Sequence, residues 1–125
     1  MRIYLYGFSP EQQSRINGLL ARLASAPAVE IRPEFRDATL ATILDGQARV
    51  GAALTRVEPV VLFHEAEDAE IETFITSYKV TQCPEPIWAA VTEANLGWTF
   101  GELLSALQAE RQALAAGEPP QATNG

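Results

Sequence analysis

Apolar residues along the chain form short continuous runs separated by stripes at helical spacing. Continuous apolar runs at residues 3–8, 60–63 and 87–91 are typical of strands that are covered on both faces of a sheet. Residues 29–35 instead alternate apolar with polar side chains and include Pro33, which cannot donate to a ladder. This pattern predicts a strand at the edge of the sheet.

Three amphipathic helices are predicted between and after these strands. Their apolar stripes recur at spacings of three and four: Ile16, Leu19, Leu20 and Leu23; Ile71, Phe74, Ile75 and Tyr78; Phe100, Leu103, Leu104, Leu107 and Leu114. Ser9 with Gln12 predicts a capping box, with Pro10 at the first helical position, and the first helix should stop by Pro27. Asp68 is the expected cap of the second helix.

Thr99 and Glu102 predict a capping box at the start of the last helix, where Trp98 can pack on Leu103 as a hydrophobic staple. Within residues 38–57 a short helix should contain Leu40 and end near Gly46. The remainder of that stretch, up to residue 57, is compatible with a loop, a second helical turn or a strand.

Four strands that alternate with helices predict an α/β fold with a four-stranded parallel sheet joined by right-handed crossovers. The expected strand order is 2-1-3-4, in a three-layer sandwich of the flavodoxin-like or receiver-like type. Residues 1–115 should form a single α/β domain. Residues 116–125, which contain Gly and two Pro, are expected to be a disordered tail. No internal repeat is visible in the sequence.

Composition and charge narrow the class of partner. The chain has 125 residues, 47% of them hydrophobic, which fits one soluble domain. Nine basic against 16 acidic residues give a formal charge of −7, so nucleic acid and anionic membranes are not expected as partners. No apolar stretch approaches 18 residues and no cleavable leader is visible, so a cytoplasmic location is expected. One Cys and one His are too few for a structural zinc site in a monomer, and no cofactor is expected.

A site for chemistry would lie at the carboxyl ends of the strands, where parallel sheets bind ligands. There the candidates for catalysis are Ser9, His64 and Glu65, and the candidates for binding are Thr92, Asn95 and Trp98. Each has a structural explanation beside it: Ser9 as a helix cap, Asn95 in a turn and Trp98 as a staple. No nucleophile elbow surrounds Ser9, and the turn Gly7-Phe8-Ser9-Pro10 lacks the glycine spacing of phosphate-binding loops. The acidic residues of a phosphoacceptor site are absent from the equivalent positions, so the domain should be receiver-shaped without that chemistry.

The C-terminal half resembles a known family. Residues 86–95, Pro-Ile-Trp-Ala-Ala-Val-Thr-Glu-Ala-Asn, are followed by Trp98-Thr99 and by a Leu-rich helix that closes in Glu110-Arg111. Over about residues 59–114 this pattern resembles the small bacterial family called domain of unknown function 3783. The resemblance implies a bacterial protein and implies no mechanism. The resemblance does not extend to residues 1–58.

The sequence is compatible with two classes of function. The first is a non-catalytic binding or regulatory domain that forms a homodimer or binds a protein partner, because catalytic motifs are missing and so short a sheet leaves its edges open. The second is a small hydrolase-type enzyme that uses Ser9, His64, Glu65, Thr92 or Asn95 at the carboxyl ends of the strands.

Overall fold

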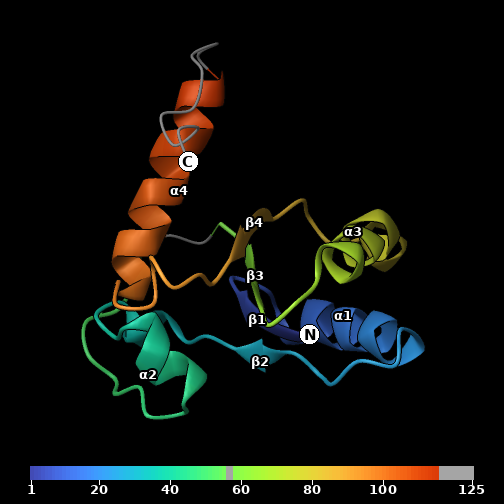
Figure 1. The fold of residues 1–125 in the computed structure, drawn as a ribbon, viewed down its shortest axis with the longest axis horizontal. Coiled ribbons are helices and arrows are strands. Elements are labelled where there is room, and N and C mark those ends of the chain that lie inside the picture. Colours follow the sequence, from blue (N-terminus) through green and yellow to red (C-terminus); the bar gives the residue numbers. More distant parts are fainter. Residues whose placement is uncertain (56–57, 116–125) are drawn as a thin grey trace.

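The computed structural model describes residues 1–55 and 58–115 and contains one four-stranded sheet (Figure 1). The strands are β1 (Arg2–Tyr6), β2 (Val29–Glu30), β3 (Val60–His64) and β4 (Ile87–Ala90). They lie in the order β2-β1-β3-β4, which confirms the predicted α/β class and strand order.

The expectation of a purely parallel sheet is wrong. β2 is parallel to β1 and β4 is parallel to β3, but β1 and β3 are antiparallel, with Arg2 opposite His64 and Tyr6 opposite Val60. The connection from β2 to β3 is long enough to return the chain to either end of the sheet, and here it brings Val60 beside Tyr6, the last residue of β1. β3 therefore starts beside the end of β1 and runs back along it.

Helices cover both faces of the sheet, giving three layers. α1 (Pro10–Arg22) and α3 (Asp68–Ser77) pack on one face, and α2 (Leu40–Leu44) and α4 (Phe100–Ala115) pack on the other (Figure 1). Alternate strand residues separate into two cores, so that Tyr4 and Leu62 face α2 and α4 while Leu5 and Phe63 face α1 and α3. Helices on both faces explain why the apolar runs of β1 and β3 are continuous.

The predicted helix starts are correct to within one residue. Ser9 and Gln12 form the capping box of α1, and Thr99 and Glu102 form that of α4. The cap of α3 is Glu67 rather than Asp68, because Glu70 reaches back to the Glu67 N–H at 2.9 Å. α3 continues into a 3₁₀ turn, η2 (Tyr78–Thr81).

Where the structure describes them, residues 29–35 and 38–57 form only short elements of secondary structure. β2 takes the expected edge position but has only two residues, and the chain then forms the 3₁₀ turn η1 (Pro33–Phe35). α2 ends at Leu44, close to the predicted stop at Gly46. Beyond it, Gly51 and Leu54 donate backbone hydrogen bonds to the carbonyls of Glu34 and Pro33, so residues 45–55 form a loop that packs against η1, while residues 56 and 57 lie outside the described residues.

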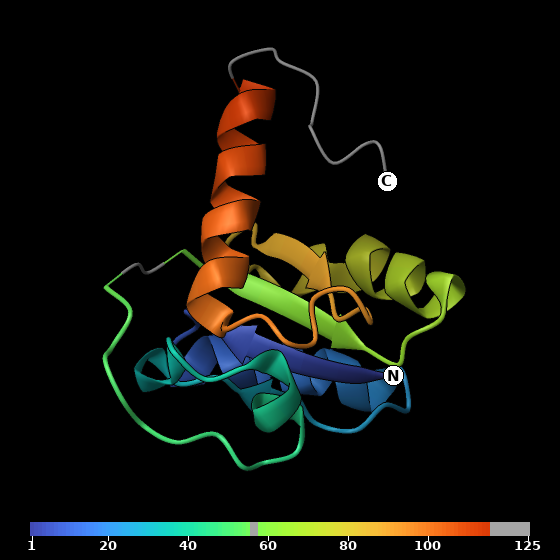
Figure 2. The same cartoon turned by 60° about the vertical axis from the view of Figure 1, so that its left-hand side comes forward.

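α4 extends well beyond the sheet (Figure 2). Its first two turns contribute Phe100, Leu103 and Leu104 to the core, and Gln108 is buried one turn later. Among the described residues no helix is long and apolar enough to cross a bilayer. The tail predicted at residues 116–125 lies outside the described residues.

Candidate functional site

The carboxyl ends of β3 and β4 bring most of the predicted site residues to one edge of the sheet. His64 ends β3 and is followed by Glu65, while Thr92 and Asn95 follow β4. Because β3 and β4 are parallel, these four residues emerge at the same end. Arg2, at the start of β1, is paired with His64 there.

Ser9 lies at the opposite end of the sheet. It follows β1, whose last residue, Tyr6, is paired with the first residue of β3. Its hydroxyl accepts a hydrogen bond from the Gln12 N–H at 3.2 Å, and the Gln12 side chain accepts from the Ser9 N–H at 2.9 Å. The antiparallel pairing of β1 with β3 thus separates Ser9 from His64, and the nucleophile–base pair that a parallel sheet would assemble does not form.

His64 and Glu65 are adjacent without forming a hydrogen bond. The His64 Nδ1 atom lies 3.9 Å from the Glu65 Oε1 atom, and that carboxylate is 68% exposed. Nδ1 itself is shielded from solvent and has no hydrogen-bond partner among the described residues. A separation of 3.9 Å is longer than a hydrogen bond, so Glu65 does not orient the His64 imidazole.

Thr92 and Asn95 form a closed turn after β4. The Thr92 N–H donates to the Asn95 side-chain carbonyl at 2.8 Å, and the Asn95 N–H donates to the Thr92 hydroxyl at 3.3 Å. The Asn95 amide also donates to the Ala90 carbonyl at 3.1 Å. Trp98 is 40% exposed, and its carbonyl accepts a hydrogen bond from the Leu40 N–H. The polar groups of Thr92 and Asn95 therefore shape the backbone.

The first turns of α2 and α4 offer no anion site, although helix N-termini often bind anions. Their leading N–H groups already donate to backbone carbonyls of the opposite loop, at 2.9–3.0 Å: Leu40 to Trp98, Ala41 to Leu96, Phe100 to Ala38 and Gly101 to Arg36. Beside α4 lies an open hollow of about 570 Å³. An ion pair in its wall joins Arg36 to Asp37 at 3.0 Å, and the hydrogen bond from Arg36 lowers the pKa of Asp37.

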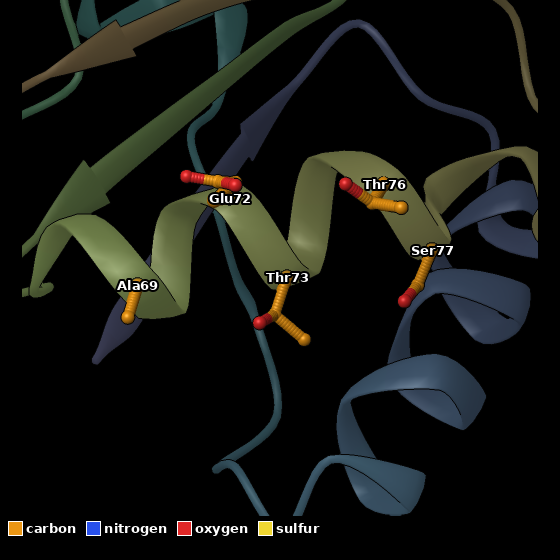
Figure 3. A pocket seen from close by; sticks show the side chains of 5 residues that line it. All are labelled: Ala69, Glu72, Thr73, Thr76 and Ser77. Atoms are coloured by element: carbon orange, nitrogen blue, oxygen red, sulfur yellow. The ribbon is translucent and has the colours of Figure 1, made fainter.

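A second hollow, of about 340 Å³, lies along the surface of α3. Figure 3 shows that all five lining side chains come from this one helix and that Thr73 and Ser77 point to the same side of it. Since a ligand site normally encloses most of its ligand between several elements, a depression along a single helix is not a credible site.

A third surface, which the sequence did not predict, lies at the outer edge of β4. Two hollows of about 430 and 270 Å³ flank this strand, and Trp88 and Glu85 line both. The first also has Ile75, Tyr78, Lys79 and Cys83, and the second has Pro86, Ile87, Leu107, Glu110 and Arg111. Burial raises the pKa of the Tyr78 hydroxyl, which donates to the Pro84 carbonyl at 2.6 Å. The one signal for this surface in the sequence was the predicted edge position of β4. The hollows themselves could not be predicted, because the residues that line them come from distant parts of the chain.

Comparisons with known proteins bear on the C-terminal half. In the described part of the chain no three His, Cys, Asp or Glu side chains come together as a metal site would require. No curated protein and no solved structure matches the chain. Residues 59–114 match the family model described as Domain of unknown function (DUF3783), so this segment, from the start of β3 almost to the end of α4, is similar to that family.

Proposed function

We propose that the protein is a non-catalytic interaction domain of the cytoplasm that forms a homodimer through the open edge of β4. The observation that carries this proposal is the outward-facing backbone of the strand. Ile87 and Val91 direct their N–H groups to β3, at 2.8 Å from the Pro59 and Phe63 carbonyls. Since a parallel strand alternates its hydrogen-bonding sides, Trp88 and Ala90 present theirs outward.

The edge can therefore accept another strand. An antiparallel partner would meet the outward N–H groups of Trp88 and Ala90 and the carbonyl of Trp88, while Asn95 already bonds the Ala90 carbonyl. Strand addition of this kind derives its affinity from backbone hydrogen bonds and its specificity from flanking hollows. The two hollows beside Trp88 supply those flanks.

The charges around the edge fit a second copy of the same chain. Lys79 and Arg111 lie in the two hollows together with Glu85 and Glu110. A two-fold dimer places the same patch against itself, so a patch with both signs can pair its cations with the partner's carboxylates. A basic nucleic-acid surface would require an excess of cations, which the chain lacks.

The hydrolase alternative loses support from the same geometry. Ser9 and His64 stand at opposite ends of the sheet, and Thr92 and Asn95 hydrogen-bond each other. The proposal therefore assigns these residues to folding.

Analytical ultracentrifugation of the full chain over a range of concentrations tests the proposal. The parent should sediment as a dimer at micromolar concentration and above. Ala90→Pro removes an outward N–H at an edge position where proline is tolerated, so this variant should be monomeric with an unchanged circular dichroism spectrum. Val29→Lys, at the opposite edge, is the matched control and should remain dimeric. A parent that is monomeric throughout, or a dimer that dissociates only with Val29→Lys, would rule the β4 interface out.

A further inference from the structure

The two central strands are related by a local two-fold axis. Each residue of β1 corresponds to the residue 58 positions further along the chain in β3, and Tyr4 is paired with its own equivalent, Leu62. The flanking pairs follow the same rule, with Arg2 opposite His64 and Tyr6 opposite Val60. Self-pairing of equivalent positions is what an isologous interface between two copies of one unit produces.

The same shift of 58 holds through the next helix and the turn after it. Gly7 has φ +84° and its equivalent Glu65 has φ +55°, both in the left-handed region. Ala24 and Gln82 are the next such pair, at φ 59° and 57°. These four are all but one of the residues with positive φ in the described chain, the exception being Gly46. Left-handed backbone is uncommon outside glycine, so two matched pairs are strong evidence of one shared backbone path.

From β2 and β4 onward the shift becomes 60, because the turn into β4 is two residues longer. Ile31 donates to the Leu5 carbonyl at 2.7 Å, and its equivalent Val91 donates to the Phe63 carbonyl at 2.8 Å. Thr39 and its equivalent Thr99 bridge each other across the axis. The four reciprocal bonds at the starts of α2 and α4 obey the same shift: the Leu40 bond to Trp98 mirrors the Phe100 bond to Ala38, and the Ala41 bond to Leu96 mirrors the Gly101 bond to Arg36.

Many core positions of the two halves match. Six pairs of equivalent residues are both buried, at 7% exposure or less: Ile3 and Val61, Leu5 and Phe63, Ile16 and Phe74, Leu20 and Tyr78, Leu40 and Phe100, Ile43 and Leu103. Most of the side chains differ: no residue of 1–24 is identical to its equivalent in 59–82, and between 27–46 and 87–106 the identical pairs are Thr39 with Thr99 and Leu44 with Leu104. Only the backbone arrangement therefore reveals the repeat, which explains why none is visible in the sequence.

The family match supports the same division independently. It begins at Pro59, the equivalent of Met1, and covers one βαβα unit rather than the whole sheet. We propose that residues 1–46 are a second, diverged copy of the unit at residues 59–106, and that the surface through which the second unit holds the first is specific for a unit of its own kind. That surface comprises β3 and residues 96–101, which β1 and residues 36–41 occupy in this chain.

The proposal predicts that the second unit can replace the first in the full chain. In the homotandem variant, residues 59–104 stand in place of residues 1–44, and the chain continues unchanged from Asp45. Both copies carry Ala90→Pro, and the parent with Ala90→Pro is the control, so that the result does not depend on the proposed dimer. The homotandem should unfold in urea in one transition, with an m value within about 15% of the control, because m follows the surface buried on folding. Two transitions, or an m value near half that of the control, would overturn the proposal.

If the homotandem has no cooperative unfolding transition, a smaller exchange tests whether the two units are equivalent. The start of α1 is grafted onto α3 in the parent by Glu65→Gly, Glu67→Ser, Asp68→Pro, Ala69→Glu and Glu70→Gln, with Ala66 retained. The control graft is displaced by one residue and keeps Ile71, which packs on the core: Ala66→Gly, Asp68→Ser and Ala69→Pro. The aligned graft should melt at or above the parent temperature, and the displaced graft several degrees below it. Equal losses in the two grafts would refute the equivalence of the units.

Discussion

Replacing Gly7 with alanine should destabilise the protein by about 2 kcal/mol. Gly7 joins β1 to the cap of α1 at φ +84°, a conformation that costs a residue with a Cβ about 1–2 kcal/mol. A Cβ there would also lie 3.0 Å from the Glu58 carbonyl oxygen and 3.0 Å from the Pro59 Cα, both of them backbone atoms just before β3, and overpacking of this kind adds about 1–3 kcal/mol. The smaller entropy of the unfolded alanine chain offsets only about 0.4–1 kcal/mol of this penalty.

Gly18 provides a control of opposite sign. It lies exposed within α1, and a Cβ added there would meet no other atom within 4 Å, so Gly18→Ala should stabilise the chain by about 1 kcal/mol through helix propensity. Urea unfolding followed by circular dichroism and by tryptophan fluorescence measures both variants against the parent. The reasoning fails if Gly7→Ala unfolds within about 0.5 kcal/mol of the parent, or if Gly18→Ala is the less stable of the two variants.

Three further predictions concern single side chains. Glu65→Gly should raise the free energy of unfolding by about 0.5–1 kcal/mol, since glycine relieves the left-handed backbone at φ +55°; a loss in urea titration would contradict this. Asn95→Ala removes the two hydrogen bonds that the Asn95 side chain makes in the turn after β4 and should cost about 1–2 kcal/mol in the same titration, whereas a neutral result would free Asn95 for a binding role. Burial raises the pKa of Tyr78 in the native state. The contribution of Tyr78 to the free energy of unfolding is therefore complete below about pH 10 and declines as the pH rises further. Tyr78→Phe, although less stable near neutral pH through its lost bond to Pro84, should decline less steeply in alkaline thermal melts; equal slopes would refute the assignment.

Local features of the fold could be predicted because each depends on a few neighbouring residues. Ser9 and Gln12, and likewise Thr99 and Glu102, cap their helices by hydrogen bonds within one turn. The edge position of β2 followed from its alternating pattern and Pro33. The direction of β3 could not be predicted, since a continuous apolar run is the same in either direction and the connection before it is too long to fix its sense.

The direction of β3 relative to β1 decides which of the predicted site residues lie close together. His64, Glu65, Thr92 and Asn95 follow β3 and β4, which are parallel as predicted, so these residues do meet at one edge. Ser9 follows β1 and is carried to the far end. The β4 hollows escaped prediction for a different reason. Their walls combine residues from α3, η2, β4 and α4, and the packing of α4 beside β4 depends on the tertiary fold alone.

The departures from symmetry make the two outer edges of the sheet unequal, which favours one of them for association. Two equivalent open edges would let molecules add end to end into a filament rather than close as a dimer. In the first unit, α2 stops at Leu44 and the chain turns back, so that Gly51 and Leu54 bind the backbone just beyond β2. In the second unit the equivalent helix continues for 16 residues, and its added turns supply one wall of the β4 hollows. The joining segment bonds η1 and leaves the two residues of β2 exposed, so the proposed preference for β4 follows from its greater length of four residues and from the hollows beside it.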